Sequence, residues 1–263
     1  MLKKLLKYDL LNVYKVLVVF YILAIIFAGF TRIFLNINNS TIFNIIGQIC
    51  SGICISMIFN IIINNIMRVW VRFSKNLYGD ESYLTHTLPV NKKTIYLSKF
   101  LTSIITMFTS VIMIILSVFI AYYSKENLEF VRNLLTSIAN IYDSTVVNFL
   151  LVTFFVFFLE LTVLLQAGYT GLILGNKMNN NKLLFSILFG FISYIVTQVF
   201  TLILIFIAGI FNQEIMNLFM TNEIANLEML NVIMYLAIAI YLLCIIIYYF
   251  IDIKIFNKGV NVD

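Results

Sequence analysis

Few side chains in this chain of 263 residues could carry out chemistry, and their spacing does not favour it. His86 is the only histidine, so an ordinary zinc site, a haem pair or a Ser-His-Asp triad would lack its partners. Cys50 and Cys54 are spaced as helix neighbours rather than as Cys-x-x-Cys, and we interpret them, with Cys244, as apolar packing residues. We therefore expect no catalytic residue and no metal site.

A phosphate-binding loop is also missing from the sequence. The nearest pattern, Gly171-Leu-Ile-Leu-Gly175-Asn-Lys177, lacks both the required spacing and a preceding strand. We therefore expect the chain to bind no cofactor and not to hydrolyse ATP. An intramembrane protease or lipid-modifying enzyme would need paired carboxylates or a Ser-His set within the membrane, and Glu160 is the one acidic residue well inside a predicted span.

The composition predicts a membrane protein, because 62% of the residues are hydrophobic and only 11% are charged. A soluble domain of this size carries about 25% charged residues. The apolar residues form six blocks of spanning length without the alternation of barrel strands, which predicts an all-α fold. The blocks cover residues 16–35, 42–72, 93–123, 146–175, 183–211 and 230–252. No repeat or linker divides them, so we expect one transmembrane domain over residues 1–263.

Basic residues predict the orientation of these spans. Of the 17 Lys and Arg residues, only Arg32, Lys125 and Arg132 lie on the side of the membrane opposite to the N-terminus in the predicted topology. The excess on the other side places both termini in the cytoplasm. The net charge of +5 therefore bears on topology, and we expect no nucleic-acid partner.

Amphipathic patterns predict helices outside the spans. Leu2, Leu6 and Val13 share a helical face opposite several lysines, and Asp9 interrupts this apolar face. The pattern favours an interfacial helix on the inner leaflet. The alternative is a plain extension of the first span, which we expect to be kept in the mature protein rather than cleaved as a signal peptide. Residues 128–142 and 215–227 also have helical patterns, and both could rest on the outer surface.

The connection between the second and third spans is specified most sharply. Gly79 permits a turn, Asp80 can cap a helix and Glu81 suits its first turn, so we expect a short helix from about residue 81 to 87. Pro89 ends this helix, after which Asn91 can cap the third span. The short helix would offer an apolar contact surface that includes Tyr83, Leu84 and Leu88. A generic capped loop is the alternative interpretation.

The same segment carries a family resemblance. Leu77-Tyr-Gly-Asp-Glu-Ser-Tyr-Leu-Thr-His-Thr-Leu-Pro-Val-Asn91, followed by a basic helix start and Leu97-Ser-Lys99, resembles the corresponding stretch of six-span ABC transporter permeases. These are of the type-2 exporter class of Gram-positive bacteria, whose versions commonly have Asp-Glu, then Gly or Ser, Tyr-Leu-Thr, an apolar residue and Thr-Leu-Pro-Val. His86 stands where those proteins have the apolar residue. The layout of six spans resembles the same class.

The resemblance implies a coupling helix that docks on a separate ABC ATPase subunit, which would bind ATP and Mg²⁺. It also implies a second permease chain, identical or related, in the bacterial cytoplasmic membrane, and export of a hydrophobic or amphipathic substrate such as an antimicrobial or toxin-like peptide or a drug. A membrane sensor or assembly subunit that docks an ATPase without transporting is the alternative. By position, the expected ATPase contacts are Asp80, Glu81, Tyr83, Leu84, Thr85 and His86.

Polar and small residues inside the predicted spans could border a translocation path or pack helices together. Glu160 lies on the same helical face as Ala167, Gly171 and Gly175, a stripe that permits close helix approach. In the second span Asn60 and Asn64 are expected to form interhelical hydrogen bonds. The candidates for the path or for packing are Asn44, Gln48, Ser51, Glu160 and Gly171.

Overall fold

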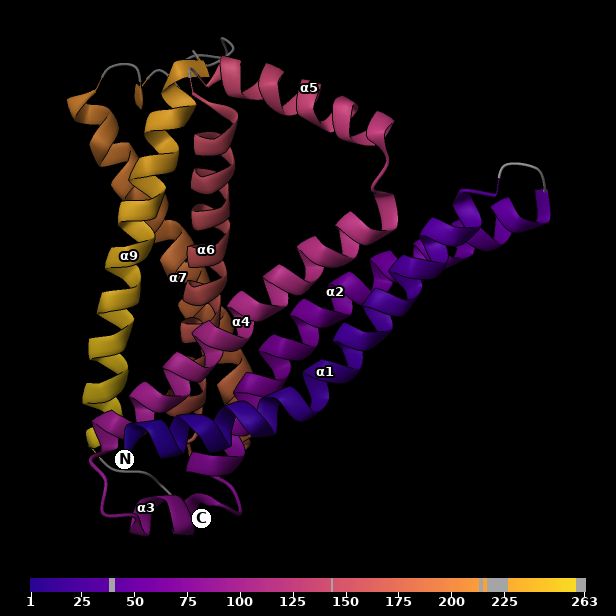
Figure 1. Ribbon diagram of the computed structural model, residues 1–263. Coiled ribbons are helices and arrows are strands. Elements are labelled where there is room, and N and C mark those ends of the chain that lie inside the picture. The colour runs from indigo at the N-terminus through magenta and orange to yellow at the C-terminus, as the bar shows by residue number, and fades with distance from the viewer. Residues whose placement is uncertain (38–40, 143, 213–214, 217–226, 259–263) are drawn as a thin grey trace. The chain divides into compact units, whose positions relative to one another are not determined.

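The computed structural model describes residues 1–37, 41–142, 144–212, 215–216 and 227–258. The regular secondary structure of these residues is α-helical and comprises eight helices (Figure 1). The all-α prediction is therefore confirmed. Most of the second expected outer helix, residues 217–226, lies outside the described residues.

Six of the helices are long and apolar enough to cross a membrane, as the sequence predicted, so the chain is a multi-pass membrane protein. The predicted spans agree with the α6 and α7 bounds to within a residue, whereas α1 and α2 extend further than predicted. Two shorter helices are α3 (Ser82–Thr87) and α5 (Lys125–Ile141). The six long helices are α1 (Leu2–Leu35), α2 (Thr41–Leu77), α4 (Lys92–Tyr122), α6 (Val146–Gly175), α7 (Lys182–Phe211) and α9 (Leu227–Asn257).

The N-terminal segment and the first span are one continuous helix. α1 has no break between Leu2 and Leu35, so a separate N-terminal helix does not form. Its buried residues recur every three or four positions and include Asp9, Val13 and Leu17. Because α1 packs against α2 and α4, this stripe faces protein at Asp9 and Val13. An interfacial position for the lysine-rich end stays a prediction.

The chain divides into two compact units, residues 1–130 and 131–263. In the first unit α1, α2 and α4 pack together, and a buried polar network joins them. Asn65 Nδ2 donates to Ser110 Oγ over 2.7 Å, Thr106 Oγ1 donates to Asn65 Oδ1 over 3.1 Å, and the Tyr21 hydroxyl lies 2.7 Å from Ser110 Oγ. These bonds satisfy polar groups that would be costly to leave unpaired in an apolar surrounding.

The prediction that Asn60 and Asn64 of α2 form interhelical hydrogen bonds is wrong. The Asn60 side chain donates to Ser56 O and the Asn64 side chain donates to Asn60 O, both within α2. Helical positions that do not face a neighbouring helix can satisfy an amide in this way. Asn65, one residue further, faces α4 and forms the interhelical bonds instead.

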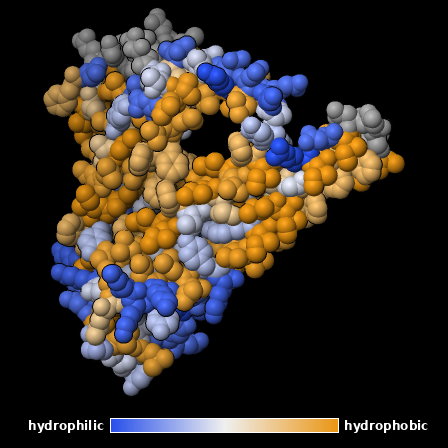
Figure 2. All heavy atoms as spheres, viewed as in Figure 1, coloured by the Kyte–Doolittle hydropathy of each residue, from blue (hydrophilic) through white to orange (hydrophobic). Residues whose placement is uncertain are grey.

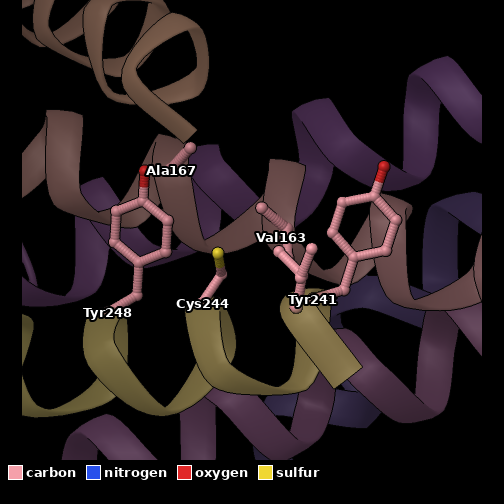
Figure 3. Packing of buried hydrophobic residues seen from close by; sticks show 6 residues of the cluster. Val163, Ala167, Tyr241, Cys244 and Tyr248 are labelled. Atoms are coloured by element: carbon pink, nitrogen blue, oxygen red, sulfur yellow. The ribbon is translucent and has the colours of Figure 1, made fainter. Parts of the chain in front are cut away.

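In the second unit α6 packs against α7 and α9. A Cβ built on Gly171 would lie 2.4 Å from the Gly190 Cα atom of α7, so the backbones of these helices approach closely. Gly175 meets Ser186 of α7 in the same way. On the side toward α9, Figure 3 shows Val163 and Ala167 of α6 beside Tyr241, Cys244 and Tyr248.

The surface pattern suits a lipid environment. Many large apolar side chains of the long helices are exposed, among them Phe59, Phe191 and Phe250. In Figure 2 hydrophobic residues cover the long helices, whereas hydrophilic residues gather around α3 and along α5. Exposing these side chains to water would cost free energy, but exposing them to lipid does not, because lipid tails are equally apolar.

Candidate functional site

The short helix α3 lies between α2 and α4, where the sequence predicted it. A turn precedes it, in which Gly79 N donates to Ser74 O over 3.0 Å and Ser82 N donates to Gly79 O over 2.9 Å. The helix ends at Thr87 because Leu88, held extended before Pro89, cannot continue it. Two predictions, the short helix and the cap of the following span, are confirmed: the Asn91 side chain accepts from Lys93 N over 3.2 Å.

The predicted start of α3 is wrong by one residue. Glu81 occupies the N-cap position, and neither Glu81 nor Asp80 caps the helix with its side chain. The Glu81 carboxylate instead accepts from Arg72 Nη1 over 2.6 Å and from Asn76 Nδ2 over 3.0 Å. The bond to Arg72 joins two ionised groups and Asn76 adds a second donor, whereas a cap would supply a neutral backbone amide, which explains the difference.

These contacts set the ionisation of Glu81. Burial alone would raise its pKa, but the hydrogen bond from Asn76 and the positive charges of Arg72 and Lys99 outweigh burial and hold the pKa below its ordinary value. Glu81 is therefore ionised at neutral pH and keeps its bond to Arg72.

The six expected ATPase contacts divide between two faces of α3. Tyr83 and Leu84 expose 76% and 68% of their surfaces, and Asp80 is exposed beside them. Thr85 is buried, and its hydroxyl donates to Glu81 O over 3.0 Å. We call the exposed face, with Asp80, Tyr83 and Leu84, the outward face, and the buried face, with Thr85, the inward face.

His86 belongs to the inward face. Its Nε2 atom lies 3.1 Å from Leu77 O at the end of α2, and Ser82 is buried on the same side. Together with Glu81, these residues fasten α3 to the end of α2. Three of the six expected contacts therefore lie on the inward face, which packs on the protein. The other three lie on the outward face, which is exposed.

Behind α3 lies a group of charged side chains, Asp9, Arg72, Glu81 and Lys99, that we call the anchoring cluster. Lys99 Nζ lies 2.5 Å from Asp9 Oδ1, and both side chains are about 5% exposed. Arg72 Nε lies 3.4 Å from the same oxygen, while Arg72 Nη1 contacts the Glu81 carboxylate. Ser98 adds a hydrogen bond of 3.3 Å to the second Asp9 oxygen. The cluster thus joins the ends of α1, α2 and α4 to the start of α3.

The sequence did not predict the anchoring cluster, although it contained two signals. Asp9 is an acid inside an otherwise apolar arc, and Lys99 is a cation inside the third predicted span. Charges are rarely buried unless they are paired, so each predicts an opposite charge nearby. The pairing itself joins residues 90 positions apart and cannot be derived from local periodicity.

The candidates within the spans lie in different surroundings. In α2, Asn44 and Gln48 are exposed, whereas Ser51 is half-buried and hydrogen-bonded to the Tyr122 hydroxyl of α4. In the second unit the Tyr194 hydroxyl of α7 donates to Glu160 over 3.4 Å. Gly171 lies at the close contact between α6 and α7. Glu160 and Gly171 therefore face neighbouring helices of their own unit.

The second unit also buries a carboxylate that the sequence did not predict to be a site residue. Asp252 of α9 is fully buried, and Thr170 Oγ1 of α6 donates to it over 2.7 Å. Nearby, the Gln166 amide donates to Ile245 O over 3.2 Å, which also ties α6 to α9. Among the residues that the structure describes, no group of His, Cys, Asp and Glu side chains is arranged to hold a metal ion.

Neutralising Glu81 should loosen α3 without unfolding the spans. The Glu81→Gln variant removes the charge that Arg72 contacts, and because the Glu81 side chain is 46% exposed the loss should be about 0.2–1 kcal/mol. Amide hydrogen exchange of residues 82–87 should then accelerate at most about fivefold, with α2 and α4 unchanged. Asp80→Asn, which removes an exposed neighbouring charge, is the matched control and should change nothing.

Acid should act on α3 as this substitution does. The pKa of Glu81 is lower in the folded protein than its ordinary value of 4.5, so the stabilisation is complete above that value and is lost as pH falls through the lower, folded one. Exchange in α3 should thus be the same for wild type and variant in strong acid. A difference that persists there would contradict the role of the carboxylate.

Comparison of the chain with protein-family models, curated proteins and solved structures finds no match.

Proposed function

We propose that the chain is the transmembrane permease subunit of an ABC exporter, and that α3 is the coupling helix on which a separate ATPase subunit docks. The observation that carries the proposal is a short helix, held between two spanning helices, that turns Tyr83 and Leu84 outward. The family resemblance of residues 77–99 gives that surface its proposed partner. ATP and Mg²⁺ would bind to the ATPase subunit.

The outward face of α3 has the composition of a protein-binding surface. Tyr83, Leu84 and Leu88 expose apolar surface beside the exposed polar residues Asp80 and Thr87. Tyrosine is enriched at interface hot spots, and exposed apolar patches ringed by polar groups commonly mark binding sites. The neighbouring Asp80 would add charge complementarity at the rim of the contact.

The anchoring cluster gives a docked ATPase a physical route to the spans. A force on α3 would act on Glu81, through Arg72 on Asp9, and so on α1, α2 and α4 together. Buried charges keep their partners because separating them in an apolar surrounding is costly. The ends of α1, α2 and α4 would therefore move together, and the half-exposed bond between Glu81 and Arg72 would link this movement to α3.

Charge distribution supports a cytoplasmic position for α3. The end of α2, which precedes α3, carries Arg68, Arg72 and Lys75. The start of α4, which follows α3, carries Lys92 and Lys93. Such enrichment marks the cytoplasmic side of bacterial membrane proteins. We accordingly place α3 and both termini in the cytoplasm, where the ATPase and its nucleotide are present.

The cargo and the partner chain follow from the resemblance. We propose a hydrophobic or amphipathic peptide as cargo and a second permease chain, identical or related, as partner. Exposed Asn44 and Gln48 of α2 are candidates to border the path between the two chains. A sensor or assembly subunit would dock an ATPase in the same way, but only a transporter would show ATP hydrolysis that its cargo stimulates.

Replacing the exposed apolar side chain of Leu84 with a charged one should weaken binding of the ATPase to α3. We expect Leu84→Asp to reduce co-purification of the proposed ATPase subunit by about tenfold or more, the effect of losing an interface hot spot. Because Leu84 is 68% exposed, the permease itself should fold and insert normally. The measurement is the ratio of ATPase to permease after affinity purification in mild detergent.

Met178→Asp is the matched control for this experiment. Met178 lies in the connection between α6 and α7, on the same predicted side of the membrane, and is 36% exposed. The same change of an exposed apolar side chain to an acid should there leave the ratio unchanged. Undiminished binding of the ATPase by the Leu84 variant, or an equal loss in both variants, would contradict docking on α3.

A further inference from the structure

The helix α5 segregates its side chains into two opposite halves. At 100° per residue, its charged residues and most of its other polar residues fall within one arc of about 140°. The remaining half is apolar apart from Asn127, and most of its large side chains are exposed. The residues of this half are Leu128, Phe130, Val131, Leu134, Leu135, Ile138, Ala139 and Ile141.

The neighbouring helices restrict where α5 can lie. Only residues 123 and 124 separate it from the end of α4 at Tyr122, and only residues 142–145 separate it from the start of α6 at Val146. At no more than about 3.6 Å per residue, these links keep the two ends of α5 within about 11 Å and 18 Å of the two span ends. Both ends are therefore held near one membrane surface.

The start of α5 is also fixed locally. Ser124 Oγ accepts from Asn127 N over 3.0 Å, and the Asn127 side chain donates to Tyr122 O over 2.9 Å. The second bond ties the first turn of α5 to the last residue of α4. Since α4 begins beside α3 and ends beside α5, this surface is the one opposite to α3.

We propose that α5 lies in the lipid interface of this membrane surface, with its apolar half inserted among the acyl chains at headgroup depth. The occupant of that half is lipid because each adjoining span also exposes large apolar side chains at the end joined to α5, Phe119 of α4 and Val147 of α6. A helix with such a segregated face typically enters the boundary region by about 5–10 Å.

The attraction is hydrophobic and does not depend on anionic lipid. The polar half carries Lys125, Glu126, Glu129 and Arg132, whose charges cancel. A basic surface helix, by contrast, gains about 1 kcal/mol per Lys or Arg from anionic headgroups. The boundary between the two compact units falls within α5, so this lipid contact would hold the connection between the units at the bilayer surface.

Spin labels on the two halves of α5 test the proposal in the full chain. Single cysteines would replace Leu128, Val131 and Leu135 on the apolar half, or Glu129, Arg132 and Thr136 on the polar half. The native cysteines are buried, so the labelled wild-type chain supplies the blank. The proteins would be reconstituted in phosphatidylcholine vesicles, with and without phosphatidylglycerol, and probed with oxygen and with a water-soluble nickel chelate.

We expect labels on the apolar half to collide severalfold more with oxygen than with the nickel chelate, and labels on the polar half to show the reverse. The pattern should be the same in both lipid mixtures. Equal nickel access on the two halves would place α5 in water and overturn the proposal. Poor access of both reagents to the apolar half would show that protein covers it and would also overturn the proposal. Neither result depends on whether an ATPase docks on α3.

Discussion

The Asp9→Asn variant is expected to lose about 3–5 kcal/mol of stability, the usual cost of removing one partner from a buried ion pair. The Asp9 carboxylate contacts both Lys99 and Arg72, and its side chain is only about 5% exposed. Asparagine keeps the size of the side chain but not the charge that compensates the two cations. Thermal unfolding of the detergent-solubilised chain should show a much lower midpoint, together with a lower yield of monodisperse protein.

A second substitution distinguishes the loss of pairing from a general defect at this site. In Asp9→Asn with Lys99→Met, the buried cation that faced Asp9 is removed as well, so the double variant should be more stable than the sum of the single effects predicts. Coupling energies of directly interacting residues are about 0.5–3 kcal/mol. Additive losses in the double-mutant cycle would show that the two charges do not stabilise each other.

The Gly171→Ala and Gly52→Ala variants should change stability in opposite directions. At Gly171 the added methyl group would lie 2.4 Å from backbone atoms of Gly190, so α6 and α7 must separate, at a cost of about 1–3 kcal/mol. At Gly52 the new methyl group would meet no atom within 4 Å beyond its chain neighbours and the adjacent backbone of its own helix, and alanine should stabilise helix α2 by about 0.5–1 kcal/mol.

Unfolding midpoints of the two variants in one detergent give the comparison directly. Gly29→Ala in α1, which also has open space, is a second control and should behave as Gly52→Ala does. A neutral or stabilising effect of Gly171→Ala would mean that α6 and α7 pack less closely than the structure indicates. The close approach is what the Ala167, Gly171 and Gly175 stripe predicts for a helix interface.

Local signals in the sequence were sufficient for much of the fold. Spanning length and apolar composition predicted the six long helices, because the bilayer imposes a minimum length on each. Turn and cap chemistry around Gly79, Pro89 and Asn91 predicted α3 and the start of α4. Each of these features depends on neighbours within a few positions in the chain.

The contacts that hold α3 were not predictable in the same way. Glu81 suited a place in the first turn of a helix, but tertiary structure brings Arg72 and Asn76 close enough to bind its carboxylate. Asp9 looked like an imperfection in an amphipathic pattern, yet it is the centre of a buried cluster. A single sequence does not reveal which charges, 60 to 90 positions apart, fold together.

Site-specific photocrosslinking from α3 tests docking of an ATPase most directly. Tyr83 would be replaced by p-benzoylphenylalanine, a change that its 76% exposure should tolerate, and crosslinks would be formed in intact cells and identified by mass spectrometry. We expect a crosslink from position 83 to a nucleotide-binding ATPase subunit, and none to that subunit from the same residue at position 178. If position 83 yields no ATPase crosslink, or crosslinks it no more than position 178 does, α3 is not the docking site and the exporter assignment is contradicted.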